Sequence, residues 1–165
     1  TTRPIRKNET NGSDYFFVNK KKFIQLKRKN FFIETANVFD HLYGSPYKYI
    51  KKTFRADNYI LFDIDWQGAK RLRRKFNRND IIDIFILPPS KFELKKRLTK
   101  RGRDNNIEIK KRLSLAVSEI GHYNEYKYNI VNDNINQTVN NILKIIEYEE
   151  LLYKINFKVK SIKIF

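Results

Sequence analysis

Two carboxylates separated by one residue, Asp63 and Asp65, follow an apolar run in the segment YILFDIDWQGA at residues 59–69. The run predicts a buried strand over residues 59–64. Successive side chains of a strand point to opposite faces, so both acids would project on the same side. Ligand chemistry in α/β proteins gathers beyond the carboxyl ends of parallel strands, where two acids can position magnesium-bound water or accept hydrogens from a substrate. The alternative is a strand that simply enters a polar turn, and an isolated DxD favours that alternative.

The elements that must position these acids alternate along the chain. Apolar and β-branched runs predict strands at residues 15–18, 31–39, 59–64, 81–87 and 128–132. Helical periodicity predicts helices around residues 23–26 and over 46–56, 67–76, 91–100, 107–126 and 135–153. Further local signals are a turn at Tyr43-Gly44-Ser45, an N-cap at Ser90, a helix stop at Gly102, and a strand-like tail, NFKVKSIKIF, to which we assign no function. This alternation predicts an α/β fold with a mostly parallel sheet.

Composition narrows the classes of function. The 165 residues are 41% hydrophobic and 15% aromatic, which indicates one folded domain. The net charge of +17 would attract any polyanion. However, Lys, Asn, Ile, Phe and Tyr are all abundant, as AT-rich coding produces, so the charge is weak support for nucleic-acid binding. The absence of cysteine excludes disulfides and thiolate chemistry, and two histidines make a structural zinc site untenable. Without a bilayer-length apolar run or an apolar leader, we expect a cytoplasmic protein.

Arginines, tyrosines and one acid form a first constellation: Arg3, Arg6, Tyr15, Tyr43 and Glu34. Guanidinium forks and phenolic hydroxyls donate hydrogen bonds to phosphate oxygens. A carboxylate opposite them can accept hydrogen bonds from N1–H and the exocyclic amine of guanine. Together with the two aspartates, these residues describe a pocket for a guanine mononucleotide. Taken singly, each has a simpler explanation, as a solvated basic face, the edge of the core or a paired surface acid.

A second constellation lies at residues 95–113, where Arg97 and Arg101 are one helical turn apart. A loop with one glycine then leads to a helix that carries Arg112. Phosphoryl transfer is catalysed mostly by positioning and by neutralising charge on the transferring group, which a mobile loop with several arginines can supply. The alternative is a solvated pair of basic helices. The use of arginine instead of lysine at these positions slightly favours phosphate chemistry.

The chain resembles guanylate kinase along nearly its whole length. The matching strings, in the order and spacing of that family, are TTRPIR with ETNGSDYFFV, FFIETANVF, YGS, ILFDIDWQGA, IFILPPS, LKKRLTKRGRDNN with KKRL, and IVND. The resemblance implies a P-loop kinase-like three-layer α/β fold with a mostly parallel sheet. It further implies a single domain over 1–165, with a GMP-binding lobe at residues 10–48 and a helical lid at residues 97–112.

The same resemblance implies roles for individual side chains. The GMP phosphate would be held by Arg3, Arg6, Tyr15 and Tyr43. Guanine would be recognised by Glu34, Ser45 and Asp65. The ATP phosphates and the transferring group would be bound, and the transfer catalysed, by Arg97, Arg101 and Arg112. Asp63 would act beside them near the magnesium, and Asn132 would contact adenine. Mg²⁺ would enter with ATP, since no direct protein ligand for it is identifiable.

The departures from the family pattern concern mainly the donor site. Guanylate kinases open with a strand and a glycine-rich P-loop ending in Gly-Lys-Ser/Thr, and no such motif occurs in these residues. The sequence also has no methionine, so we expect that its natural start is missing. A chain without the P-loop should bind GMP far better than it turns GMP over. Smaller departures are Ile5 to Asn8 in place of the usual Pro-Arg-Pro-Gly, and Lys127 in place of an acid.

The leading hypothesis is therefore a cytoplasmic enzyme of purine nucleotide metabolism that transfers a phosphoryl group from MgATP to GMP, giving ADP and GDP. The alternative is a non-catalytic guanylate-kinase-like module that binds phosphorylated partners. The retained arginines at 97, 101 and 112 favour the enzyme, since a module freed from ATP chemistry has no physical need for them. A basic nucleic-acid binder rests on charge alone, so we expect no specific nucleic-acid partner and no membrane partner. The sequence leaves the oligomeric state open.

Overall fold

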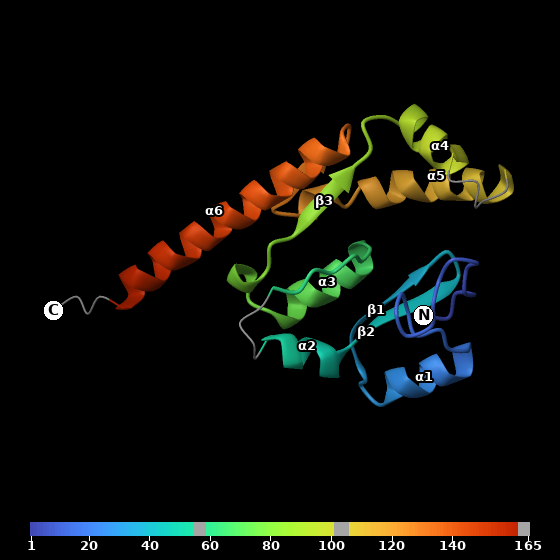
Figure 1. The fold of residues 1–165 in the computed structure, drawn as a ribbon, viewed down its shortest axis with the longest axis horizontal. Helices are drawn as coiled ribbons and strands as arrows, with labels where there is room; N and C mark the ends of the chain where they lie inside the picture. The colour runs from blue at the N-terminus through green and yellow to red at the C-terminus, as the bar shows by residue number, and fades with distance from the viewer. Residues whose placement is uncertain (55–58, 101–105, 162–165) are drawn as a thin grey trace. The chain divides into compact units, whose positions relative to one another are not determined.

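The computed structural model describes residues 1–54, 59–100 and 106–161. Its contacts divide the chain into two compact units, Thr1–Asn77 and Arg78–Phe165. Each unit mixes helices with a small two-stranded sheet, so the fold is of the α/β type (Figure 1). No helix in these ranges is long and apolar enough to cross a membrane. The single-domain organisation and the lobe and lid boundaries stay predictions.

An antiparallel hairpin forms the centre of the first unit. The elements of this unit are α1 (Lys20–Arg28), β1 (Phe32–Val38), β2 (His41–Pro46), α2 (Tyr47–Phe54) and α3 (Trp66–Lys75). β1 pairs with β2, and the two residues between them, Phe39 and Asp40, both have positive φ, as a tight hairpin turn requires. The turn predicted at residues 43–45 is wrong, since those residues continue β2.

A small aromatic and aliphatic core fixes α1 on the hairpin. Phe23 of α1 and Ile33 of β1 are 1% and 2% exposed, and the rings of Phe23 and Phe32 stack at 4.6 Å. Asn19 caps α1 by accepting a hydrogen bond from the Lys22 backbone N–H. The amphipathic helix predicted around residues 23–26 is thereby confirmed.

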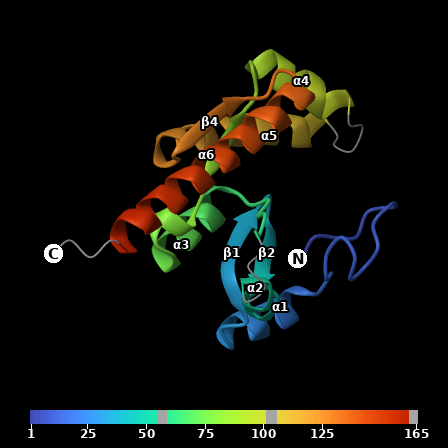
Figure 2. The ribbon, with the colours of Figure 1, turned by 60° about the vertical axis from the view of Figure 1, so that its left-hand side comes forward.

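α3 packs along β1 (Figure 2) through a row of side-chain donors. Gln67 donates to the carbonyl oxygen of Asn37, Arg71 to the hydroxyl of Thr35, and Lys75 to the carbonyl oxygen of Ile33. The spacing explains this register. Four helical residues rise about 6.0 Å and two strand residues about 6.6 Å, so donors four apart meet acceptors two apart. α3 thus donates to two backbone oxygens and one side-chain hydroxyl of β1.

Two predicted strands of this unit are absent. Residues 15–18 make only an isolated bridge between Asn11 and Tyr15, and residues 59–65 have no regular structure. A strand needs a neighbour to pair its backbone groups, and neither segment has a paired strand in the part of the chain that is described. The argument that a strand places Asp63 and Asp65 on one face therefore fails. The predicted helix at 67–76 is confirmed and begins one residue earlier.

Within the described residues, the second unit contains a parallel pair of strands and three α-helices. Its elements are η1 (Arg78–Asp80), β3 (Ile84–Leu87), α4 (Lys91–Lys100), α5 (Asn106–Ile120), η2 (Tyr123–Glu125), β4 (Tyr128–Val131) and α6 (Ile135–Ser161). β3 and β4 pair in parallel, as expected for strands joined by helices. Ser90 accepts from the Glu93 N–H, which confirms the predicted cap. The strand-like tail is wrong up to Ser161, since α6 continues there, and Gly102 lies outside the described residues.

Candidate functional site

A buried carboxylate lies where β1 and β2 pair. Glu34 is opposite Ser45 in the register and is only 4% exposed. The Ser45 hydroxyl donates to Oε1 of Glu34 at 2.7 Å, whereas Oε2 is buried with no hydrogen-bond partner in the described structure. Burial raises the pKa of the Glu34 carboxyl, and the charge of Asp65 adds to the rise. An acceptor oxygen is therefore held in place without a protein donor, which is costly unless a ligand supplies one.

The first turn of α3 shapes the space beside this carboxylate. A Cβ on Gly68 would lie 2.9 Å from Oε2 of Glu34 and 3.1 Å from Cβ of Ile64, so glycine allows the helix to approach. Asp65 caps the helix: its Oδ1 accepts from the Gly68 N–H and its Oδ2 from the Gln67 amide, both at 2.9 Å. The structure thus gives Asp65 a local structural role, and its contact with guanine stays a prediction.

A cationic cluster lies near the start of the chain. The guanidinium of Arg3 donates to both carboxylate oxygens of Glu9, at 2.7 and 2.9 Å, and to the Pro4 carbonyl oxygen at 2.8 Å. Arg6, which is more exposed, lies 3.7 Å from the same carboxylate. The hydrogen bond from Arg3 holds the pKa of Glu9 below its usual value. These bonds hold the Arg3 guanidinium rigidly, although they do not use all five of its N–H groups.

Aromatic rings complete this cluster. The Arg3 guanidinium lies over the rings of Tyr15 and Phe17, each with its centroid at 5.5 Å, and the Tyr15 and Tyr43 rings meet edge to face at 6.0 Å. Burial raises the pKa of the Tyr15 hydroxyl, with the Asp63 carboxylate as the next cause. The exposed Asp63 therefore acts on this cluster. The structure brings together the residues predicted to hold phosphate, Arg3, Arg6, Tyr15 and Tyr43.

β2 connects the cationic cluster to the buried carboxylate. Tyr43 and Ser45 are two residues apart on this strand, so their side chains share a face. One end of this face carries phenol and guanidinium donors, and the other carries the Glu34 acceptor. A ligand that fits it has an anionic group at one end and hydrogen-bond donors at the other.

The second unit brings together two of the residues predicted for the donor nucleotide. Arg97 of α4 donates to the backbone oxygens of Asn132 at 2.8 Å and Asp133 at 3.3 Å, and its Nε donates to Glu93 at 3.1 Å. The Asn132 side chain accepts from the buried hydroxyl of Thr138 at 3.1 Å. Arg97 therefore ties α4 to the end of β4.

The other two lid arginines are less informative. Arg112 is partly exposed on α5, and Arg101 lies outside the described residues.

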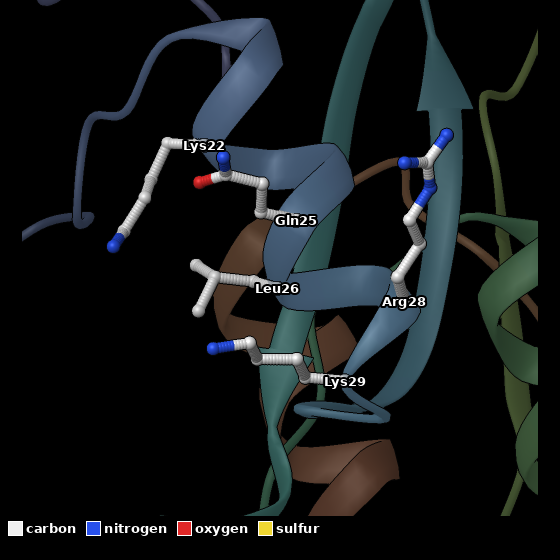
Figure 3. Close-up of a pocket in the computed structure, with 5 residues that line it drawn as sticks. All are labelled: Lys22, Gln25, Leu26, Arg28 and Lys29. Atoms are coloured by element: carbon white, nitrogen blue, oxygen red, sulfur yellow. The ribbon is translucent and has the colours of Figure 1, made fainter.

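A shallow pocket of about 320 Å³ lies on α1 (Figure 3). Lys22, Gln25, Leu26 and Lys29 project from one side of the helix and Arg28 from another (Figure 3). None of the residues predicted to bind nucleotide lines it. It is the solvated basic face of an amphipathic helix, and we assign it no role in the site.

Comparison with known proteins decides the family. The sequence model of guanylate kinases matches residues 1–149. The chain belongs to the guanylate kinase family. It is 44% identical over 151 residues to a guanylate kinase of Buchnera aphidicola subsp. Acyrthosiphon pisum, covering 92% of this chain and 72% of that protein. It is 45% identical over 151 residues to a guanylate kinase of Photorhabdus laumondii, with the same coverage.

A solved structure supports the same assignment. The crystal structure of guanylate kinase from Anaplasma phagocytophilum matches with a TM-score of 0.77 at 36% identity, over 90% of this chain and 71% of that one. Guanylate kinases are enzymes, so this chain belongs to an enzyme family. The arginine and carboxylate clusters described above are therefore considered as sites for nucleotides.

Sequence reasoning missed three residues that organise this candidate site. Glu9 orients the two arginines, Gly68 makes room beside Glu34, and Arg71 contributes positive charge there. Glu9 could have been found as the acid closest to Arg6 in an otherwise basic opening. Gly68 lies within the matching string ILFDIDWQGA, but neither Gly68 nor Arg71 shows its role there, because that role depends on how α3 packs on β1.

Proposed function

We propose that this chain carries the acceptor site of a guanylate kinase, which transfers a phosphoryl group from MgATP to GMP and releases ADP and GDP. The observation that carries the proposal is the buried Glu34 carboxylate, with Oε1 fixed by Ser45 and Oε2 unpartnered in the described structure. Guanine presents two adjacent donors, N1–H and the 2-amino group, which suit a carboxylate. Adenine presents the unprotonated N1 at the same edge, so its lone pair would face the carboxylate oxygens.

The phosphate of GMP has its counterpart at the other end of β2. Arg3 and Arg6 supply fixed positive charge, and the hydroxyls of Tyr15 and Tyr43 add donors. The salt bridge between Arg3 and Glu9 pre-orders the guanidinium, so less conformational entropy is lost when phosphate binds. We propose that GMP lies along this face, with guanine at Glu34 and the phosphate at the arginines.

On the donor side we propose that Arg97, Arg101 and Arg112 bind the ATP phosphates and the transferring group and that Asn132 contacts adenine. The lid is proposed for residues 97–112, and the GMP-binding lobe for residues 10–48 of a single three-layer domain with a mostly parallel sheet. A cytoplasmic location stays a prediction from the sequence.

Magnesium fits this scheme as a companion of ATP. Mg²⁺ keeps several waters and is usually bound by one or two carboxylates together with substrate phosphates. Within the described ranges no three His, Cys, Asp or Glu side chains gather into a metal cluster, whereas Asp63 offers one exposed carboxylate. When bound with ATP, the ion neutralises phosphate charge. Asp63 would hold one of its waters.

Calorimetric titration with GMP, IMP and AMP tests the acceptor site. We expect GMP to bind most tightly, IMP less tightly because it lacks the 2-amino donor, and AMP most weakly. A hydrogen bond to a charged group contributes about 1.5–3 kcal/mol, so GMP should bind about 10- to 150-fold more tightly than IMP. Equal affinities for GMP and AMP in a folded sample would contradict the proposal.

A further inference from the structure

We propose that Arg71 is a positioning residue for guanine recognition: its guanidinium keeps the Glu34 carboxylate negatively charged, so that both oxygens can accept hydrogen bonds from guanine. This inference rests on the proposed GMP site. It adds a residue of α3 that neither contacts the nucleotide in the scheme above nor belongs to the motifs that identify the family.

The position of Arg71 follows from the packing of α3. Gly68, where the helix meets Oε2 of Glu34, precedes Arg71 by three residues, so the two share a face of the helix. Arg71 donates through Nη1 to the hydroxyl of Thr35, which directly follows Glu34 on β1. The guanidinium is therefore anchored beside the strand that carries the carboxylate.

Several groups act on the ionisation of Glu34. Burial disfavours the charged carboxylate most strongly, and the negative charge of Asp65 at the N-cap of α3 acts in the same direction. The hydroxyl and the backbone N–H of Ser45 from β2 oppose them most, and the positive charge of Arg71 from α3 adds to that opposition. If Glu34 were protonated at Oε2, an O–H donor would face the N–H donors of guanine and recognition would be lost. Arg71 thus counteracts burial where function requires the charge.

A neutral side chain on α3 can also donate to β1. Gln67 donates through its amide to the Asn37 carbonyl oxygen one turn earlier. A glutamine at residue 71 could likewise donate to the Thr35 hydroxyl. The charge of Arg71 therefore has an electrostatic effect that is separable from its hydrogen bond, and Arg71→Gln separates the two.

The matched control is Lys75, one turn further along α3. It also donates to β1, at the Ile33 carbonyl oxygen, but it is not among the leading electrostatic influences on Glu34. Lys75→Gln removes the same formal charge from the same helix. Arg71→Lys keeps the charge and serves as the conservative variant.

The experiment has two readouts on the full chain. The first is the titration of the Glu34 carboxyl carbon by NMR without ligand, and the second is GMP affinity by calorimetry between about pH 5 and pH 8. An acid whose pKa rises stays protonated to higher pH, so Arg71→Gln should move both midpoints upward. At a pH below both midpoints, GMP affinity should fall in Arg71→Gln by the same factor as the ionised fraction of Glu34. The GMP phosphate also titrates in this range, but identically for every variant.

We expect Arg71→Lys to restore the wild-type midpoint and Lys75→Gln to leave it unchanged. An unchanged carboxyl midpoint in folded Arg71→Gln would overturn the inference, as would an equal shift in Lys75→Gln. Failure of the GMP proposal is distinguishable. In that case the wild-type chain would not prefer GMP to AMP at any pH, although the NMR titration would still report on the Arg71–Glu34 coupling.

Discussion

Glu34→Gln separates guanine recognition from folding stability. Gln is nearly isosteric with Glu, so the β1–β2 pairing and the position of α3 should be retained. In the wild type, Oε1 accepts from Ser45 and Oε2 has no partner in the described structure. The substitution replaces one of these two acceptors with an NH₂ donor and removes the charge. The effect on GMP is therefore a change in hydrogen bonding and electrostatics at one edge of the base.

The loss of GMP affinity depends on which of two orientations the new side-chain amide adopts. If its carbonyl oxygen faces guanine, its NH₂ group donates to Ser45 and guanine loses only the charge assistance of the bond. If the NH₂ group faces guanine, donor meets donor and the bond is lost outright. In this second orientation a hydrogen bond to a charged group is lost, which costs about 1.5–3 kcal/mol or about 10- to 150-fold in GMP affinity, and the first orientation costs less. AMP has no donor at N1, so its affinity should not fall.

The folding stability of Glu34→Gln should not fall along with its GMP affinity. Burial raises the pKa of Glu34, so the folded state binds that proton more tightly than the unfolded state does. The carboxyl therefore favours folding at low pH and opposes it once the pH exceeds the raised pKa. Gln carries no such charge. The stability of Glu34→Gln relative to wild type should rise with pH and be at least equal to it near neutrality.

The assay combines calorimetry with GMP and AMP and chemical denaturation at several pH values. A folded variant whose GMP affinity changes by less than about threefold, or about 0.7 kcal/mol, would refute the role of Glu34. So would a loss of AMP affinity equal to the loss of GMP affinity, since that pattern indicates general damage to the site. A variant destabilised at neutral pH would refute the argument that the charge is held at a cost.

Two further substitutions test the neighbouring groups. Gly68→Ala places a Cβ 2.9 Å from Oε2 of Glu34 and 3.1 Å from Cβ of Ile64. We therefore expect the variant to be destabilised by about 1–3 kcal/mol in denaturant unfolding and to bind GMP more weakly. A variant as stable as the wild type would show that the structure relaxes around the new methyl group at no cost. Arg3→Lys cannot bridge both oxygens of Glu9, so GMP affinity should fall about tenfold while guanosine affinity stays the same. A parallel loss of guanosine binding would place Arg3 outside the phosphate site.

The sequence predicted elements well where periodicity is long. The helices at 67–76, 91–100 and 135–153 were expected from apolar spacing and are present, although α6 extends to Ser161. Strand prediction failed at residues 15–18 and 59–64 because an apolar run shows only that a segment can be buried. Whether it becomes a strand depends on a neighbour to pair with, which local sequence does not record. The hairpin turn was misplaced because Phe39 and Asp40 adopt positive φ without glycine.

The candidate site was predictable at the level of residue types and less so in its details. Arginines, tyrosines and one acid are visible in the sequence because their chemistry suits a nucleotide. The sequence shows neither that Asp65 caps α3 nor that Glu9 fixes Arg3. Those relations depend on tertiary packing over distances that local patterns do not span.

α3 meets three separate requirements of the acceptor site within a short stretch of chain. Asp65 begins the helix, Gly68 removes the side chain that would collide with Glu34, and Arg71 supplies positive charge beside it. In the proposed site, a carboxylate that is 4% exposed would have to be ionised to recognise guanine, although burial favours its neutral form. The helix brings close packing and a cation to the same strand, and the cation acts against the effect of burial. A substitution on α3 can therefore change nucleotide selectivity without touching the nucleotide, and Arg71→Gln is the case in which the two effects separate most cleanly.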